Sequence, residues 1–270
     1  KGILAIGNDN PRLALSKISS KFFPWMPSII VAITGTNGKS STVHFLTHIW
    51  AYSGIKVGSI GTLGIKKQDK FIEKSMTTPN PILLHKTINS YKDDFIKALA
   101  IEASSHGLDQ HRLDSLKINF AAMTNISRDH MDYHGTFEKY IQAKLRLFSD
   151  ILSNGGVAVL NKDQEKFYDF ESICIKRKIR VESFGKDINA KWRIINISQK
   201  TNGQVLIFRY EKKDYKMFIP MKGIFQVENS LCALILSVNS GVSLSMALEA
   251  LKKSKAPKGR LMKVSLSIDN

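Results

Sequence analysis

One stretch limits the possible folds of this chain more than any other: an apolar run at residues 29–33 that leads into a glycine-rich turn. The turn and the residues after it read Thr34, Gly35, Thr36, Asn37, Gly38, Lys39, Ser40, Ser41 and Thr42. A buried strand, such a loop and a following helix would direct backbone N–H groups and the positive end of the helix at one point. Lys39 would then reach the outer phosphates of a nucleotide, and the Ser40 hydroxyl would bind Mg²⁺. We therefore expect a phosphate-binding loop within an α/β fold.

This loop is shorter than the general phosphate-loop pattern, which has a glycine five residues before the glycine of Gly-Lys. Here that position is Ile33, and Gly35 lies only three residues before Gly38. The alternative is an ordinary strand-turn-helix with a solvated lysine. We favour the phosphate loop because the glycines, the lysine and the hydroxyl follow the strand in the required order.

The pattern after the loop repeats strand, loop and helix. Strands are predicted at residues 29–33, 56–60, 97–101, 120–124 and 157–160, with helical stretches between them. This alternation predicts a doubly wound, mostly parallel α/β sheet whose strand carboxyl ends share one rim. The segments 192–197, 205–210 and 215–220 are short and separated by turn residues, so they predict a small antiparallel β-sheet. Helical patterns return at residues 229–238 and 244–252.

Punctuation by proline and glycine suggests three parts. Residues 1–27 contain a helical stretch at 12–22 and end in Pro24 and Pro27. Residues 28–257 would form the main domain, and residues 258–270 would follow its edge at Pro257. The chain also opens without a methionine, so we expect a fragment of a longer protein.

The net charge of +17 raises the question of nucleic-acid binding. The basic residues are mostly scattered lysines without an interleaved aromatic motif, so we expect no nucleic acid and place a nucleic-acid-dependent NTPase last among the alternatives. A basic field would still attract nucleotides. No apolar run reaches the roughly 18 residues of a membrane span. The two cysteines, Cys174 and Cys232, lack metal-ligand spacing and suit a reducing cytoplasm.

Polar side chains follow two further predicted strands. Glu102 ends one of them, at the rim that holds the phosphate loop, where a carboxylate can hold Mg²⁺ together with phosphates. The alternative there is a helix-capping cluster of Ser and His. After the next strand, His130 and His134 have the spacing of two zinc ligands on one helical face. No general-base Glu or third soft ligand accompanies them, so we favour one histidine at a magnesium site and the other in a structural role.

Two other motifs are ambiguous by themselves. Lys144 lies among apolar helical neighbours, where most lysines are solvated surface residues. Thr77-Thr78-Pro79 stands before a helix, where such residues commonly cap and start it.

Taken together, these stretches resemble the Mur ligase family of ATP-dependent amide ligases, and most closely the branch that adds the third amino acid of the bacterial cell-wall precursor. The similarity runs from about Ser28 to Lys263. The motifs that carry it are Thr-Gly-Thr-Asn-Gly-Lys-Ser at 34–40, Glu-Ala-Ser-Ser-His-Gly-Leu at 102–108, Asp-His-Met-Asp-Tyr-His-Gly at 129–135, Ala-Lys at 143–144 and Gly-Arg at 259–260. Thr77-Thr78-Pro79 and the Ser-Ser-His segment separate it from folylpolyglutamate synthetases.

The resemblance implies that residues 1–27 are the tail of an N-terminal uridine-binding domain and a linker, that residues 28–257 are the central ATP-binding domain, and that residues 258–270 are a stub of a C-terminal ligase domain. It also implies a role for each matching residue. The triphosphate loop of ATP would be residues 35–41. The catalytic residues would be Lys39, Glu102, His130 and Lys144. Magnesium would be held by Ser40, Glu102, His130 and Lys144, the last as a carbamate. The UDP-N-acetylmuramoyl-dipeptide would be held by Thr77, Thr78, Ser104, Gln110 and Arg112. Asn229 and Arg260 would contact the nucleotide.

The implied reaction is ATP-dependent addition of an amino acid to the UDP-N-acetylmuramoyl-dipeptide through an acyl phosphate, in a cytoplasmic monomer, with meso-diaminopimelate favoured over L-lysine. The sequence Asp9-Asn10-Pro11-Arg12 spells the family's diaminopimelate motif, but it precedes the phosphate loop and carries no information on the amino acid. Two alternatives stay open: a non-catalytic nucleotide-binding remnant and a folylpolyglutamate synthetase-like ligase.

Overall fold

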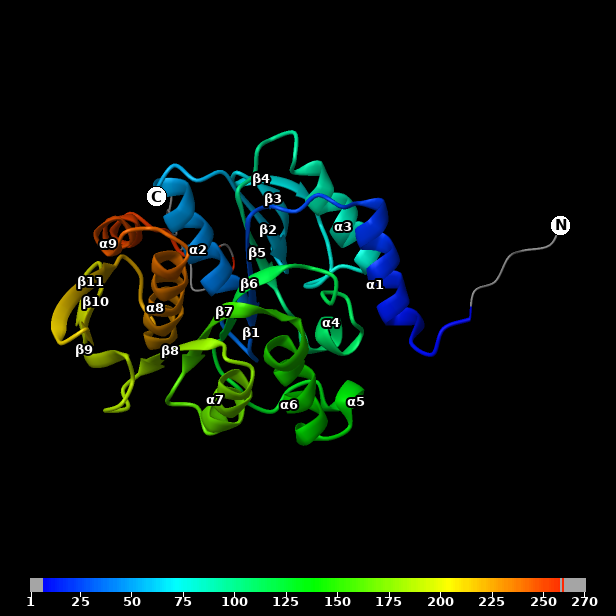
Figure 1. Ribbon diagram of the computed structural model, residues 1–270. Helices are drawn as coiled ribbons and strands as arrows, with labels where there is room; N and C mark the ends of the chain where they lie inside the picture. Colours follow the sequence, from blue (N-terminus) through cyan, green and yellow to red (C-terminus); the bar gives the residue numbers. More distant parts are fainter. Residues whose placement is uncertain (1–6, 258, 260–270) are drawn as a thin grey trace, which may run out of the picture.

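A single mixed sheet organises the molecule (Figure 1). The structure is a computed structural model that describes residues 7–257 and Gly259. Within this part of the chain the sheet has 11 strands in the order β11-β10-β9-β8-β7-β6-β1-β5-β2-β3-β4. The six parallel strands in its middle are β1 (Ile29–Thr34), β2 (Val57–Gly61), β5 (Ala98–Glu102), β6 (Ile118–Met123), β7 (Leu152–Asn161) and β8 (Arg180–Gly185). The predicted doubly wound, mostly parallel α/β fold is confirmed.

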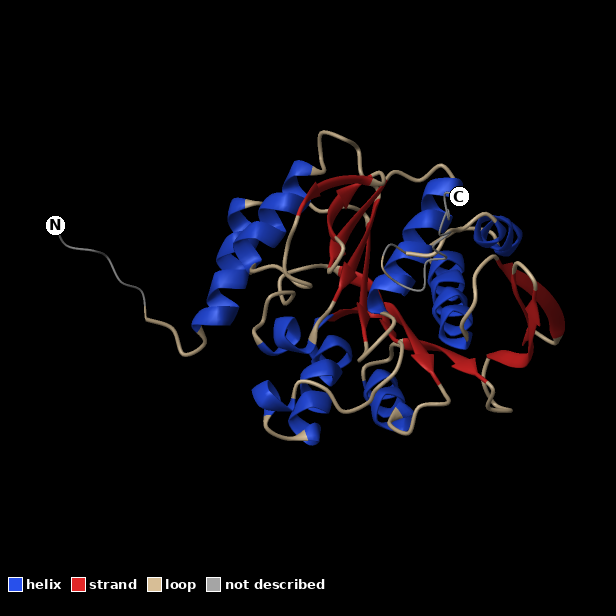
Figure 2. Ribbon diagram, turned by 180° about the vertical axis from the view of Figure 1, so that it is seen from behind, coloured by secondary structure: helices blue, strands red, loops and turns tan. Residues whose placement is uncertain are grey.

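Helices cover both faces of the sheet (Figures 1 and 2). One face carries α2 (Lys39–Tyr52), α8 (Ile224–Asn239) and α9 (Leu244–Lys252). The other face carries α3 (Pro81–Ser90), α4 (Ser105–Asp109), α6 (Phe137–Arg146), the single π-helical turn η1 (Leu147–Ile151) and α7 (Phe167–Lys176). The short helix α5 (Met131–His134) precedes α6.

Strand β1 shows why its sequence is a continuous apolar run. Val31 and Ile33 belong to the core beneath α2 and α8, whereas Ile30 and Ala32 belong to the core on the opposite face. A strand buried on both faces needs apolar residues at every position rather than at alternate ones. Its neighbours are β5 and β6, so β1 delivers the phosphate loop to the middle of the carboxyl rim.

Both edges of the sheet are antiparallel. At one edge, β3 (Gly64–Lys67) and β4 (Lys70–Glu73) form a hairpin on β2. At the other, β9 (Trp192–Lys200), β10 (Gly203–Tyr210) and β11 (Lys213–Ile219) form the predicted meander. The meander does not stand apart as a separate small sheet, because β9 pairs in parallel with β8 and continues the main sheet.

The first helix, α1 (Pro11–Phe22), packs along α3 at the side of the sheet (Figure 2). Asn10 caps it: its side-chain oxygen accepts the N–H of Leu13 at 3.0 Å, and Pro11 occupies the first helical position. The Asp-Asn-Pro-Arg letters therefore serve here as a helix start.

Candidate functional site

The loop between β1 and α2 needs glycine at two positions. Gly35 and Gly38 have φ values of +144° and +87°, a region that other residues rarely adopt. A Cβ on Gly35 would lie 2.0 Å from the Thr124 hydroxyl, and one on Gly38 would lie 2.3 Å from Oδ1 of Asn229. The two glycines therefore let the loop pass close to the end of β6 and to α8. Asn229 thereby borders the loop.

Residues that follow β6 hold the loop in place. The N–H of Asn37 donates to Oδ1 of Asn125 at 2.9 Å, and the N–H of Thr36 donates to the Asn125 carbonyl at 2.8 Å. The Thr124 hydroxyl donates to the Asn37 carbonyl at 2.6 Å. These hydrogen bonds to Thr124 and Asn125 fix the conformation of the loop.

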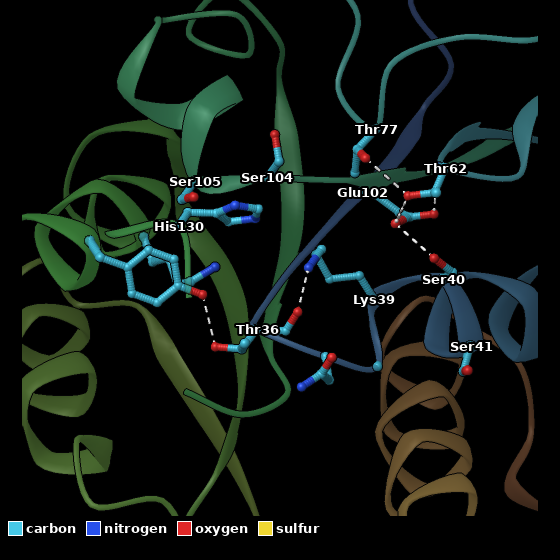
Figure 3. A pocket seen from close by; sticks show the side chains of 14 residues that line it. Thr36, Lys39, Ser40, Ser41, Thr62, Thr77, Glu102, Ser104, Ser105 and His130 are labelled. Atoms are coloured by element: carbon cyan, nitrogen blue, oxygen red, sulfur yellow. Dashed lines mark hydrogen bonds between the residues drawn. The ribbon is translucent and has the colours of Figure 1, made fainter. Parts of the chain in front are cut away.

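Lys39 lies over the loop that precedes it. Its Nζ donates to the carbonyls of Gly35 and Thr36, both at 2.8 Å. Figure 3 shows this amine facing the same space as Glu102 and His130. A positive charge over a loop of backbone N–H groups is a suitable arrangement for an anion such as a phosphate.

Glu102 lies at the end of β5 and is 2% exposed. Its Oε2 accepts the Ser40 hydroxyl at 2.9 Å and the Thr62 hydroxyl at 3.1 Å, and its Oε1 accepts the Thr62 N–H at 2.9 Å. Burial raises the pKa of Glu102, while these hydrogen bonds and the charge of Lys39 oppose that rise. The hydrogen bonds and the charge of Lys39 favour the ionised form of this buried carboxyl group, which burial disfavours.

Lys144 on α6 is 1% exposed, although its surroundings in the sequence suggest a surface lysine. Its Nζ donates to the Gly35 carbonyl at 3.0 Å and lies 4.5 Å from the centre of the Tyr140 ring. The Tyr140 hydroxyl in turn lies 2.8 Å from the Thr36 hydroxyl. Burial, followed by the charge of Lys39, lowers the pKa of Lys144 well below its usual value. The neutral form of this amine is therefore reached more easily than that of a surface lysine.

The histidines after β6 do not share a helical face. His130 precedes α5 with a φ of +54°, and His134 is the last residue of that helix before Gly135. Both rings pack against His106, with centroids 4.9 and 5.6 Å away. Within residues 7–257, no three His, Cys, Asp or Glu side chains gather as a metal-binding group. The zinc interpretation thus gains no support.

The residues predicted for the dipeptide form a connected hydrogen-bond network beside Glu102. The Thr78 hydroxyl donates to the Glu102 carbonyl at 2.7 Å and lies 3.0 Å from the Ser104 hydroxyl. Arg112 donates to the Thr78 carbonyl and, from its Nη2, to Oε1 of Gln110 at 2.6 Å. Burial lowers the pKa of Arg112.

One pocket brings most of the predicted site together (Figure 3). The predicted residues that line it are Thr36, Asn37, Gly38, Lys39, Ser40, Ser41, Thr77, Glu102, Ser104, His130 and Lys144. Gly35, Thr78, Gln110, Arg112 and Asn229 lie outside the lining, and Arg260 lies outside the described residues.

Thr62 and Tyr140 also line the pocket, and no sequence motif points to either. Thr62 follows Gly61 at the end of β2. The general rule that strand carboxyl ends share a rim could have identified it.

The oxygen atoms of Glu102 and Ser40 are suitable ligands for magnesium. Mg²⁺ prefers hard oxygen ligands and commonly takes one or two carboxylates together with substrate phosphates. Ser40 and Glu102 supply a hydroxyl and a carboxylate that already lie within hydrogen-bond distance of each other, beside the loop.

The fold and this site define a class: a doubly wound α/β domain with a phosphate-type loop at the carboxyl rim of its sheet. Comparison with known proteins narrows it. The Mur ligase middle domain matches residues 33–237, and the chain belongs to the Mur ligase family.

Curated relatives at 37–40% identity include two named UDP-N-acetylmuramoyl-L-alanyl-D-glutamate--2,6-diaminopimelate ligase. The one from Bradyrhizobium diazoefficiens is 37% identical over 258 residues, which is 94% of this chain and 53% of the relative. The one from Rickettsia bellii is 40% identical over 248 residues, which is 90% of this chain and 52% of the relative. The chain thus spans about half the length of the curated relatives it matches.

Solved structures agree with the fold. A UDP-N-acetylmuramoyl-L-alanyl-D-glutamate--2,6-diaminopimelate ligase superposes with a TM-score of 0.82 at 26% identity, over 91% of this chain and 50% of that one. The apo form of L. casei FPGS superposes with a TM-score of 0.77 at 15% identity, over 98% of this chain and 71% of that one. The second likeness concerns the fold alone. No helix within the described residues is long and apolar enough to cross a membrane.

Proposed function

We propose that residues 28–257 are the ATP-binding domain of a cytoplasmic ligase that adds meso-diaminopimelate to UDP-N-acetylmuramoyl-L-alanyl-D-glutamate. The flanking segments 1–27 and 258–270 would connect it to the rest of such an enzyme. The observation that carries the proposal is the convergence of Lys39, Ser40, Glu102 and Lys144 on one pocket at the phosphate loop. The choice of diaminopimelate rests on the names of relatives that are 37–40% identical to this chain.

In this reaction the γ-phosphoryl group of ATP passes to the side-chain carboxylate of the D-glutamyl residue, which releases ADP. The amine of the incoming amino acid then attacks the acyl phosphate and displaces inorganic phosphate. Lys39 and the backbone N–H groups of the loop would hold the triphosphate and stabilise the charge on the transferring group. Asn229 and Arg260 would contact the nucleotide.

Magnesium would be held by Ser40, Glu102, His130 and the carbamate of Lys144, and would neutralise phosphate charge there. The burial of Lys144 and its lowered pKa support the carbamate, because only the neutral form of an amine adds CO₂. The lone pair of Nζ would form the N–C bond, and one proton would leave. Mass analysis of the native protein under CO₂ and after acid treatment tests this, since the adduct is lost in acid.

The dipeptide would lie against the network beside Glu102. Thr77, Thr78 and Ser104 present hydroxyls there, and Gln110 and Arg112 would face its anionic groups. The mutual bonds of Arg112, Gln110 and Thr78 hold these side chains in position before any substrate arrives.

Phosphate release by the full-length protein tests the function. We expect release with ATP, Mg²⁺, the UDP-N-acetylmuramoyl-dipeptide and diaminopimelate, and much less with L-lysine. A Lys39→Ala variant should lose the activity. Turnover with a pteridine-glutamate in place of the UDP-substrate would instead favour a folylpolyglutamate synthetase, and nucleotide binding without turnover would favour a non-catalytic remnant.

A further inference from the structure

The turn between β2 and β3 contacts Glu102 from a second element. Gly61 pairs with Gly64 across the hairpin, so Thr62 and Leu63 form its two-residue turn. Thr62 donates twice to the carboxylate: from its N–H to Oε1 at 2.9 Å and from its hydroxyl to Oε2 at 3.1 Å (Figure 3). One residue thereby contacts both oxygens and limits rotation of the carboxylate.

The residue before Thr62 makes this approach possible. A Cβ on Gly61 would lie 2.1 Å from Oε1 of Glu102 and 2.6 Å from its carboxyl carbon. A side chain at this position would therefore displace the carboxylate. The backbone of β2 is close to Glu102 because Gly61 leaves room for it.

The direction of the hydrogen bonds links Thr62 to the predicted substrate loop. An ionised Glu102 only accepts hydrogen bonds, so in that state the single hydroxyl proton of Thr62 is donated to Oε2 of Glu102. The Thr62 hydroxyl also lies 3.0 Å from the hydroxyl of Thr77, so Thr77 must be the donor in that contact. The result is a chain of hydroxyls that runs from Thr77 through Thr62 to Glu102.

We infer that Thr62 is a positioning residue that holds the Glu102 carboxylate in place for a divalent cation and couples it to Thr77 in the substrate loop. The inference rests on the proposed function, because it takes Glu102 as a cation ligand. Thr62 itself is exposed, so its hydroxyl contributes little to the core. Partners that orient a metal ligand typically change metal affinity about 10–100-fold when they are removed.

The chain offers a matched control for the experiment. Thr201 is also exposed and is also the first residue of a two-residue hairpin turn, because Lys200 pairs with Gly203. This turn joins β9 to β10, in the meander at the far edge of the sheet (Figure 1). Thr201→Val therefore makes the same chemical change in a hairpin turn of the same length, away from Glu102.

The test measures the Mg²⁺ concentration that half-saturates binding of a fluorescent ATP analogue to the full-length protein. We expect this concentration to rise about 10-fold in Thr62→Val. Thr62→Ser keeps the hydroxyl and should match the wild type, as should Thr201→Val. Thermal unfolding without Mg²⁺ checks that all four proteins are folded at the assay temperature. Thr62→Val should unfold at a somewhat lower temperature than the other three, because the buried Glu102 carboxylate loses one hydrogen-bond donor.

An unchanged Mg²⁺ requirement in Thr62→Val, with Mg²⁺-dependent binding in the wild type, would overturn the inference and leave the proposed function standing. An equal rise in Thr62→Ser or in Thr201→Val would also overturn it, because the hydroxyl at Glu102 would then not be the cause. Absence of Mg²⁺-dependent nucleotide binding in the wild type would instead count against the proposed function.

Discussion

Replacing Gly38 with alanine should destabilise the protein through two separable costs. The first is conformational: at a φ of +87° an L-residue costs about 1–2 kcal/mol. The second is steric, because the new Cβ would lie 2.3 Å from Oδ1 of Asn229, a side chain that is 5% exposed on α8. Overpacking of this kind costs about 1–3 kcal/mol. The free energy of unfolding should therefore fall by about 2–5 kcal/mol in total.

Gly54 separates the two costs. It has a φ of +79°, but a Cβ there would meet nothing within 4 Å. Gly54→Ala should therefore lose only the conformational part, about 1–2 kcal/mol. Adding Asn229→Ala to Gly38→Ala removes the atom that is contacted. The double variant should show a favourable coupling energy in a double-mutant cycle.

Urea unfolding gives these free energies for the wild type and for four variants, provided that the dependence of the unfolding free energy on urea concentration is the same in all of them. The variants are Gly38→Ala, Gly54→Ala, Asn229→Ala and the Gly38→Ala/Asn229→Ala double variant. The Gly38→Ala variant should also bind nucleotide more weakly, because Asn229 or the loop must move. The reasoning is refuted if Gly38→Ala and Gly54→Ala destabilise the protein equally, or if Asn229→Ala brings no relief.

Three further predictions concern other parts of the molecule. Burial lowers the pKa of His85 to about 4, so the unfolded chain binds more protons between that pH and 6.5. Stability should consequently fall by about 2–3 kcal/mol from pH 7 to 4.5, and urea unfolding of His85→Leu should show that much less loss than the wild type. Asn10→Ala removes the cap of α1 and should lower the unfolding free energy by about 1 kcal/mol in the same assay, whereas no loss would mean that the cap is redundant. Cys174 and Cys232 are buried with raised pKa values, so a disulfide reagent should modify them only after unfolding; rapid modification of the native protein would contradict this burial.

Much of the fold could be predicted because its signals are local. The apolar run at 29–33 predicts a strand buried on both faces, and β1 spans Ile29–Thr34. The helix predicted at residues 244–252 is α9, Leu244–Lys252. The hairpin of β3 and β4 was not predicted, because β4 is exposed throughout and has no apolar face that would reveal it.

Some parts of the candidate site could likewise be predicted from the sequence, and others could not. Glu102 and the loop residues could be placed at one rim because each follows a strand of a parallel sheet, and strand order does not change which end of a strand faces that rim. The burial of Lys144 could not be predicted, since it depends on how α6 packs beneath the loop and on the ring of Tyr140.

The amino-acid sequence is enough to predict the class of fold, the family and the residues that carry its motifs, because strand pattern, turn chemistry and motif spacing are properties of neighbouring residues. The tertiary structure alone decided that β9 continues the main sheet, that Asn229 packs against Gly38 and that Thr62 binds the carboxylate of Glu102. Each of these contacts joins segments distant in the chain. Their geometry depends on how whole helices and strands pack together, and local sequence patterns do not specify that packing.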